Sequence, residues 1–196
     1  MAKVGARYAK IAKITDPGTS AKLPTYDKAI SPGPINSVED SPSYNDGELY
    51  GDDTLQDNFS EFTKSTITIK FTDVSEAGEQ IMSSYSYDED GEGGLVPGGN
   101  KAEYGFAHIS QKRGKRDGAA YTKFYGVFYP RLAPKYDGES LETMGGTTTL
   151  NPESVPATWL KPVGGLPKYV SPYFDTEAAA QAWVDTKLPS ADAAGG

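Results

Sequence analysis

The chain has no cysteine and only one histidine, and these two shortages exclude whole classes of chemistry. Without cysteine, the protein can hold neither disulfides nor thiolate metal sites. One imidazole cannot build a His-rich metal site, a two-histidine relay or a supportable Ser–His–Asp triad. His108 lies between aromatic residues in a predicted strand, so we expect a structural, hydrogen-bonded role for it. The sequence therefore predicts no enzyme, no cofactor and no metal site.

Apolar sequence is also scarce. Hydrophobic residues make up 37% of the 196 residues, which is low for a compact domain. No segment is apolar over the roughly 20 residues that a membrane-spanning helix needs. Residues 1–14 are basic but lack the apolar stretch of a signal peptide. We therefore expect a protein of a soluble compartment that does not contact membranes. Its low apolar content implies either extensive loops or strands that are buried only against partner chains.

Positive charge is in short supply. The 19 Lys and Arg residues are outnumbered by 27 Asp and Glu residues, which gives a net charge of -8. Tight nucleic-acid binding needs clustered cations against the phosphates, so this balance argues against it. The same balance suits a surface along which DNA slides, because a weakly repelling wall does not retain phosphate.

The clearest element present is an alternating strand over residues 66–72. Its apolar face comprises Ile67, Ile69 and Phe71. Asp73, with Glu76 three residues later, predicts the N-cap of a helix over residues 73–85. The apolar stripe of this helix comprises Ala77, Ile81, Met82 and Tyr85. We expect the strand face, Ile81 and Met82 to belong to the core of one subunit.

Residues 102–111 and 120–129 predict an aromatic hairpin. In its first strand, Tyr104 and Phe106 share a face with His108. In its second strand, the face with Tyr125 and Val127 is opposite to the face with Phe124 and Phe128. The connection between the strands, residues 112–118, is basic and contains the glycines that a tight turn needs.

The opening and middle of the chain are less regular. Residues 8–14 predict a strand. From residue 24 to residue 58 the chain is polar and rich in proline, and Ile35 and Val38 are nearly its only aliphatic residues before Leu49. We expect a long arm there that is either disordered or ordered by other subunits. Residues 139–150 predict one or two strands, and residues 152–172 an irregular segment.

A second helix is predicted over residues 176–188, with Asp175 as its N-cap. Its packed side is expected to comprise Ala179, Ala182, Trp183 and Thr186, with Trp183 as the anchor against the sheet. Residues 190–196 predict a loose tail. The chain therefore predicts one mainly β domain over residues 1–196, an antiparallel sandwich or barrel with a flanking helix and a C-terminal helix.

A Gly-rich acidic segment, residues 87–100, resembles two kinds of ligand loop without matching either. A phosphate loop would follow an apolar strand and open a helix, with Lys and Ser or Thr after its glycines. Asp88, Asp90 and Glu92 lack the twelve-residue pattern with a terminal Glu of a calcium loop. We interpret the segment as a solvated loop, with weak calcium binding as the alternative.

The basic connection at residues 112–116 has three interpretations. It is a solvated tip whose charges discourage edge aggregation, a contact with an acidic segment of another subunit, or, less in keeping with the composition, a nucleic-acid contact. The candidate inter-subunit residues are Leu49, Tyr50, Asp52, Asp53, Asp88, Asp90, Glu92, Lys112, Arg113, Lys115 and Arg116.

The order of these features resembles the major tail proteins of long non-contractile phage tails. The segments that carry the resemblance are the opening strand, Leu49-Tyr50-Gly51-Asp52-Asp53, the strand and helix of residues 66–85, Phe124-Tyr125-Gly126-Val127-Phe128, and Phe174-Asp175-Thr176-Glu177 with Trp183. They span nearly the whole chain, and their order carries the resemblance. The irregular segment at residues 151–172 and the basic tip depart from the pattern. An added C-terminal immunoglobulin-like domain, found in some relatives, is not expected after Trp183.

The resemblance implies a tail-tube-like β-sandwich, six copies to a ring, with rings stacked into the tail tube of a virion. Such a subunit is made in the host cytoplasm. Its implied partners are its own copies and the tape measure, tail terminator and tail tip proteins, with genomic DNA only in transit. We expect an acidic or neutral channel lining, with residues 112–116 away from it. The alternative is a β-sandwich that binds carbohydrate or a host surface through its tyrosines, and a hydrolase is a less favoured third.

Overall fold

Twelve strands and two helices form in the described part of the chain, residues 2–51, 54–83, 86–87, 95–96, 102–116, 119–135 and 153–189 of a computed structural model. The strands are β1 (Ala2–Asp16), β2 (Thr25–Tyr26), β3 (Ile35–Ser41), β4 (Tyr44–Gly51), β5 (Thr54–Phe62), β6 (Ser65–Phe71), β7 (Ser86–Tyr87), β8 (Leu95–Val96), β9 (Tyr104–Arg116), β10 (Ala119–Pro134), β11 (Glu153–Trp159) and β12 (Tyr169–Val170). The helices are α1 (Glu76–Met82) and α2 (Glu177–Lys187). The predicted mainly antiparallel β fold with a flanking helix and a C-terminal helix is confirmed.

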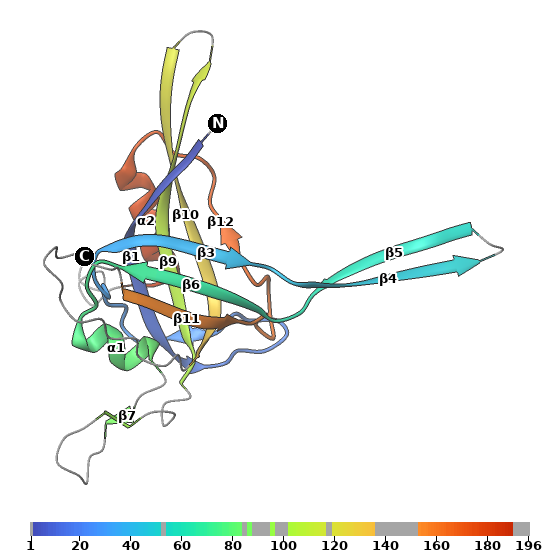
Figure 1. The fold of residues 1–196 in the computed structure, drawn as a ribbon, viewed down its shortest axis with the longest axis horizontal. Coiled ribbons are helices and arrows are strands. Elements are labelled where there is room, and N and C mark those ends of the chain that lie inside the picture. The colour runs from blue at the N-terminus through green and yellow to red at the C-terminus, as the bar shows by residue number, and fades with distance from the viewer. Residues whose placement is uncertain are drawn as a thin grey trace, which may run out of the picture.

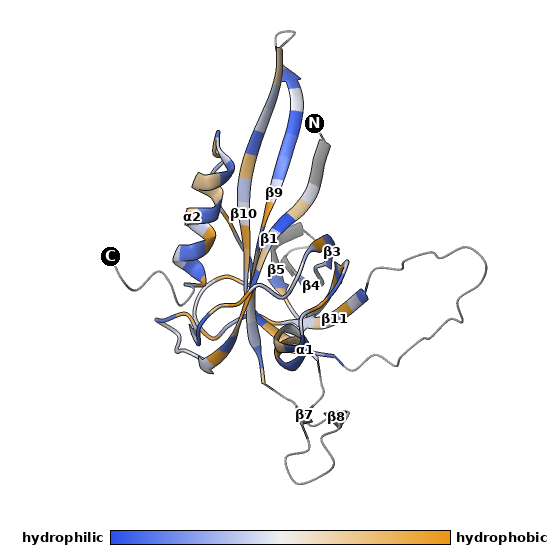
Figure 2. Ribbon diagram, turned by 90° about the vertical axis from the view of Figure 1, so that its left-hand side faces the viewer, coloured by the Kyte–Doolittle hydropathy of each residue, from blue (hydrophilic) through white to orange (hydrophobic). Residues whose placement is uncertain are grey.

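One large sheet dominates the molecule. Its strands follow the order β2-β1-β9-β10-β11-β6-β3, and β12 pairs with β10. The sheet curves back on itself, so that β3, β6 and β11 cross over β1, β9 and β10 (Figure 1). Ile11 on β1 and Ile30, just before β3, exchange backbone hydrogen bonds of 3.0 and 2.9 Å. Helix α2 lies on the outer side of β9 and β10, which gives three layers (Figure 2).

Two cores separate these layers. The main core lies between the two halves of the sheet and includes Ile11, Ile67, Ile69, Phe71, Met82, Tyr104, Phe106, Tyr129, Leu132 and Trp159. The second core lies between the sheet and α2 and includes Ala107, Ile109, Phe128, Ala180, Val184 and Leu188. Strand alternation explains the division along β10, since Tyr125 and Val127 enter the main core and Phe128 enters the second. The predicted faces of both hairpin strands are confirmed.

Helix α1 begins later than predicted, because Ser75 and not Asp73 is its N-cap. The Ser75 hydroxyl accepts the backbone N–H of Gly78 at 3.2 Å, while the Ser75 N–H donates to the Pro32 carbonyl at 2.8 Å. Ser75 itself is extended, with φ -70° and ψ 148°, as an N-cap residue usually is. Ala77, predicted to face the core, is exposed, and Gly78 is buried instead. A Cβ at Gly78 would lie 3.1 Å from Pro32, so the glycine allows this close approach.

Helix α2 also begins one residue later than predicted. Thr176 is the N-cap, and its hydroxyl accepts the N–H of Ala179 at 3.3 Å. Asp175, the predicted cap, is engaged in an ion pair with Lys123 of β10. The carboxylate therefore joins α2 to the sheet and leaves the capping position to the next hydroxyl.

The packed face of α2 differs from the predicted one. Its buried residues are Ala180 and Val184, whereas Ala182 and Thr186 are exposed. Trp183 is half-buried and packs against the second core, so its predicted role as an anchor is confirmed. Small residues lie on both sides of this helix, so the sequence pattern identifies Trp183 but not the buried Ala180 and Val184.

Strand β11 was not predicted, since residues 152–172 were expected to be irregular. It lies between β10 and β6, and all seven of its residues have partners on β6, from Glu153 opposite Phe71 to Trp159 opposite Ser65. Pro156 disguises this strand, because proline is rare inside sheets. The last pair between β10 and β11 is Pro134 with Ala157, so Pro156 has no residue of β10 opposite it. The strands predicted at residues 139–150 lie outside the described residues.

The polar stretch at residues 24–58 is not one continuous arm. Its middle part is β3, which pairs with β6, and Ile35 and Val38 pack against the main core. The expectation that this stretch lacks partners within the chain is therefore wrong for β3. Beyond β3, the β4–β5 hairpin leaves the body of the molecule and projects away from it (Figure 1).

Candidate functional site: two projecting hairpins

The β4–β5 hairpin, residues 44–62, reaches far beyond the cores. Its strands pair from Tyr44 opposite Phe62 to Gly51 opposite Thr54, and they pair with no other strand of the described chain. Its base is fixed by an edge-on contact of Phe62 with Tyr44 and by packing of Phe62 on Trp159, with ring centroids 6.0 and 4.9 Å apart. Beyond this base, β4 and β5 pair only with each other among the described elements.

This hairpin carries negative charge alone. Its charged residues are Asp46, Glu48, Asp52, Asp53, Asp57 and Glu61, and it contains no Lys or Arg. Asp46 is exposed and forms no ion pair with the described part of the chain. Glu61 lies 3.4 Å from Lys161, but 69% of its side chain remains exposed. We call residues 44–62 the acidic hairpin.

The predicted contact residues of this region are split between described and undescribed positions. Leu49 and Tyr50 lie in β4, where the pairing register shifts between them. Such a shift marks a β-bulge, which increases the local twist of the ribbon. Asp52 and Asp53 lie outside the described residues, as do Asp88, Asp90 and Glu92 of the Gly-rich loop.

The second projection is formed by the outer parts of β9 and β10, residues 112–116 and 119–123. The predicted basic connection is wrong in one respect, because residues 112–116 belong to β9. Lys112 stands opposite Lys123, and Arg113 opposite Thr122. The basic residues Lys112, Arg113, Lys115, Arg116 and Lys123 all lie on this ribbon. We call it the basic hairpin.

The two faces of the basic hairpin differ in how their charge is compensated. Lys112 donates to the Tyr173 hydroxyl at 3.3 Å and lies 4.8 Å above its ring centroid, and Lys123 pairs with Asp175. Arg113 and Lys115 are exposed, and neither pairs with a carboxylate of the described residues. Two cations on one face thus remain available to a partner.

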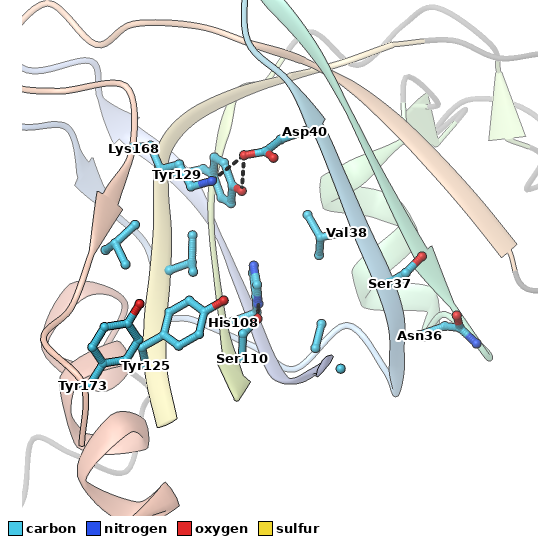
Figure 3. A pocket seen from close by; sticks show the side chains of 14 residues that line it. Asn36, Ser37, Val38, Asp40, His108, Ser110, Tyr125, Tyr129, Lys168 and Tyr173 are labelled. Atoms are coloured by element: carbon cyan, nitrogen blue, oxygen red, sulfur yellow. Dashed lines mark hydrogen bonds and ion pairs between the residues drawn. The ribbon is translucent and has the colours of Figure 1, made fainter. Parts of the chain in front are cut away.

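A cavity of about 320 Å³ lies between β3 and the inner face of β9 and β10 (Figure 3). Asp40 of β3 closes one end, because its carboxylate accepts the Tyr129 hydroxyl at 2.9 Å and pairs with Lys168. Burial alone would raise the pKa of Asp40, but the hydrogen bond and charge of Lys168 outweigh it and lower that pKa. This side-chain cluster is therefore internally neutralised.

His108 lines the same cavity. Its ring is stacked with Phe106 and Tyr129, with centroids 5.5 and 6.3 Å away, and Ser110 Oγ lies 3.4 Å from its Nδ1. Burial lowers the pKa of His108 to about 4, so the ring is neutral near pH 7. The predicted position among aromatic rings in a strand is confirmed.

The described residues contain no group of three His, Asp or Glu side chains that could hold a metal ion. Over the same residues, neither helix has the length and apolarity to cross a membrane.

Sequence reasoning missed the Asp40 cluster, because its members are 89 and 128 residues apart and share no local pattern. The charge pattern identified the basic hairpin, whereas the acidic hairpin was predicted only as part of a long polar arm. The structure does not bring the two hairpins together, since they project from the body in different directions (Figure 1). No protein-family model matches the chain, and no curated protein is significantly similar to it in sequence.

Proposed function

We propose that this protein is a structural subunit that assembles with its own copies into stacked rings, as the resemblance to phage major tail proteins implies. The rings would form the tail tube of a virion, through which DNA passes. The number of copies in a ring would be six. The protein acts through its surfaces and has no catalytic role.

The acidic hairpin is the observation that carries this proposal. A two-stranded ribbon alone in water is at best marginally stable. Here such a ribbon projects away from the body of the molecule, and its strands pair with no other strand of the described chain (Figure 1). A projection of this kind gains stability when another subunit covers it.

The edge of the large sheet supports the same proposal. Strand β3 ends the strand order, and no further described strand covers its outer edge. Unpaired backbone groups at an edge are a template for strand pairing between chains, and closing a sheet around a ring removes such edges. The 37% hydrophobic content agrees with burial that is completed between subunits.

The remaining partners follow from the same resemblance. At the ends of a tube the subunit would meet the tape measure, tail terminator and tail tip proteins. Genomic DNA would touch it only in transit. An acidic or neutral channel lining would let DNA slide, because DNA carries one negative charge per roughly 1.7 Å of its axis. The basic hairpin would then lie away from the channel.

Electron microscopy of the purified protein, with size-exclusion chromatography and light scattering, tests the proposal. Rings or tubes of uniform diameter are the expected result. A protein that stays monomeric at all concentrations and binds glycans would refute assembly and favour the carbohydrate-binding alternative.

A further inference from the structure

We infer that the acidic hairpin of one copy binds the basic hairpin of a second copy, so that subunits associate head to tail. This inference deepens the proposed function and rests on it for the identity of the partner.

Charge complementarity is the first argument. The acidic hairpin contains six acidic residues, from Asp46 to Glu61, and no Lys or Arg. The basic hairpin carries five cations, and Asp117 at its connection is the only acidic residue between Lys112 and Lys123. Complementary potentials of this kind steer association and fix which surfaces pair.

Free charge is the second argument. Arg113 and Lys115 on one side, and Asp46 on the other, have no ion-pair partner among the described residues. Some charges elsewhere on the molecule are paired within the chain, such as Arg7 with Glu177 at 3.1 Å and Arg131 with Glu103 at 2.6 Å. Exposed cations outside the hairpins, such as Lys13 and Lys28, also lack an ion pair within the described part of the chain, but Arg113 and Lys115 share one face of a projecting ribbon.

Geometry decides that the contact joins different copies. The two hairpins leave the body in different directions, so they cannot pair within one chain (Figure 1). A contact between two different surfaces is heterologous, and repeating it gives a closed ring or an open filament. A dimer with two-fold symmetry leaves these surfaces free for further copies unless the acidic hairpin of each copy binds the basic hairpin of the other.

Two charge-reversed variants test the inference by complementation. One variant carries Arg113→Glu and Lys115→Glu on the basic hairpin. The other carries Asp46→Lys and Asp57→Lys on the acidic hairpin. Each variant alone places like charges opposite one another at the substituted positions and weakens the attraction between the hairpins, so its self-association at low salt should weaken by at least about tenfold. An equimolar mixture should associate again, because the unchanged acidic hairpin of the first variant meets the unchanged basic hairpin of the second.

The measurement is light scattering after size-exclusion chromatography, at low and high salt. Circular dichroism and melting temperature establish that both variants are folded. The matched control is Lys13→Glu with Lys28→Glu, two exposed cations outside the hairpins, which should associate as the unchanged protein does. Salt should weaken the unchanged association, since exposed charges are screened over about 8–10 Å.

The inference would be overturned if the folded variants assemble normally. It would also be overturned if each variant fails to associate alone and the mixture of the two fails as well. Loss of DNA binding from the basic variant alone, with assembly unchanged, would assign that hairpin to nucleic acid instead. These results are distinguishable from failure of the proposed function. If tubes form and charge reversal does not affect them, only the hairpin contact is refuted. If the mixture associates but no rings or tubes form, only the tail-tube assembly is refuted.

Discussion

Ile69 and Phe71 are completely buried on β6 and face the main core between the two halves of the sheet. Replacing either by alanine removes apolar contacts and leaves a cavity. We expect Ile69→Ala or Phe71→Ala to lower the free energy of unfolding by about 2–5 kcal/mol, measured by urea denaturation. The matched control is Thr66→Ala, on the same strand but exposed. An unchanged midpoint for both core variants would contradict their assignment to the core.

His108 makes stability depend on pH over a defined window. Its pKa is about 4 in the folded protein and near 6.5 when unfolded, so the unfolded state binds more protons between these values. The free energy of unfolding should therefore fall as pH falls from 6.5 to 4, by on the order of 3 kcal/mol. Asp40 and Lys168 face the ring with opposing effects on its pKa.

The variant His108→Phe tests this dependence, because it keeps an aromatic ring between Phe106 and Tyr129 without a titrating group. Its stability should be flatter than that of the unchanged protein over the same pH range, measured by urea denaturation at several pH values. Parallel curves for the two proteins would assign the proton uptake to other residues. Asp40 titrates at lower pH, because its pKa is lowered.

The position of a residue could be predicted where strand alternation determines its face. It could not be predicted where several side chains compete for one hydrogen-bonding role. The buried face of β6 follows from its sequence, since every second residue is apolar. The helix caps do not, because Asp73 and Ser75 are both good N-cap residues and the hydrogen bond to Pro32 selects the second. Asp175 was likewise displaced as a cap by its ion pair with Lys123.

At the scale of elements, α2 depends on one close approach to the sheet. A Cβ at Gly126 of β10 would lie 2.4 Å from Cε3 of Trp183. Gly126→Ala should therefore cost about 1–3 kcal/mol through overpacking and change the Trp183 environment. Thermal denaturation with fluorescence measures both effects. Adding Trp183→Leu should relieve part of the cost, and a double variant whose cost is the sum of the two singles would contradict this packing.

Element prediction succeeded for strands that carry their own apolar pattern and failed for strands defined by their neighbours. Strand β9 reads clearly from its alternating aromatic residues. Strand β11 has Pro156 and little alternation, and it becomes a strand because β6 pairs along its whole length. The acidic hairpin has no regular alternation of apolar and polar residues, so no local signal separates a ribbon from a disordered arm.

For the whole molecule, the acidic hairpin is expected to be dispensable for folding and required for assembly. Thr63 N–H donates to the Ser43 carbonyl at 3.0 Å, so the chain is already closed at the base of the hairpin. Replacing residues 44–62 by Asn-Gly should join Ser43 to Thr63 through a tight turn. The shortened protein should keep its circular dichroism spectrum and remain monomeric in electron micrographs and light scattering.

The unchanged protein under the same conditions is the reference for that experiment. Normal tubes from the shortened protein would show that the hairpin is not an assembly element. A shortened protein that does not fold would show instead that the hairpin supports the core through Phe62 and Trp159. Retaining Phe62 in a second, longer replacement separates this outcome from a defect in assembly.

The pairing of β1 with β9 also determines the order in which the sheet can form during synthesis. Lys13 is paired with Tyr104, and Ala2 with Arg113, so the first strand to leave the ribosome waits for a partner made much later. At ordinary rates of translation the interval is roughly 5–20 s. Strands β3 and β6 can pair sooner, but β11 must be made before the two halves become one sheet. A nascent chain halted before residue 153 therefore exposes two unfinished sheet edges, which a chaperone or a second nascent chain can cover.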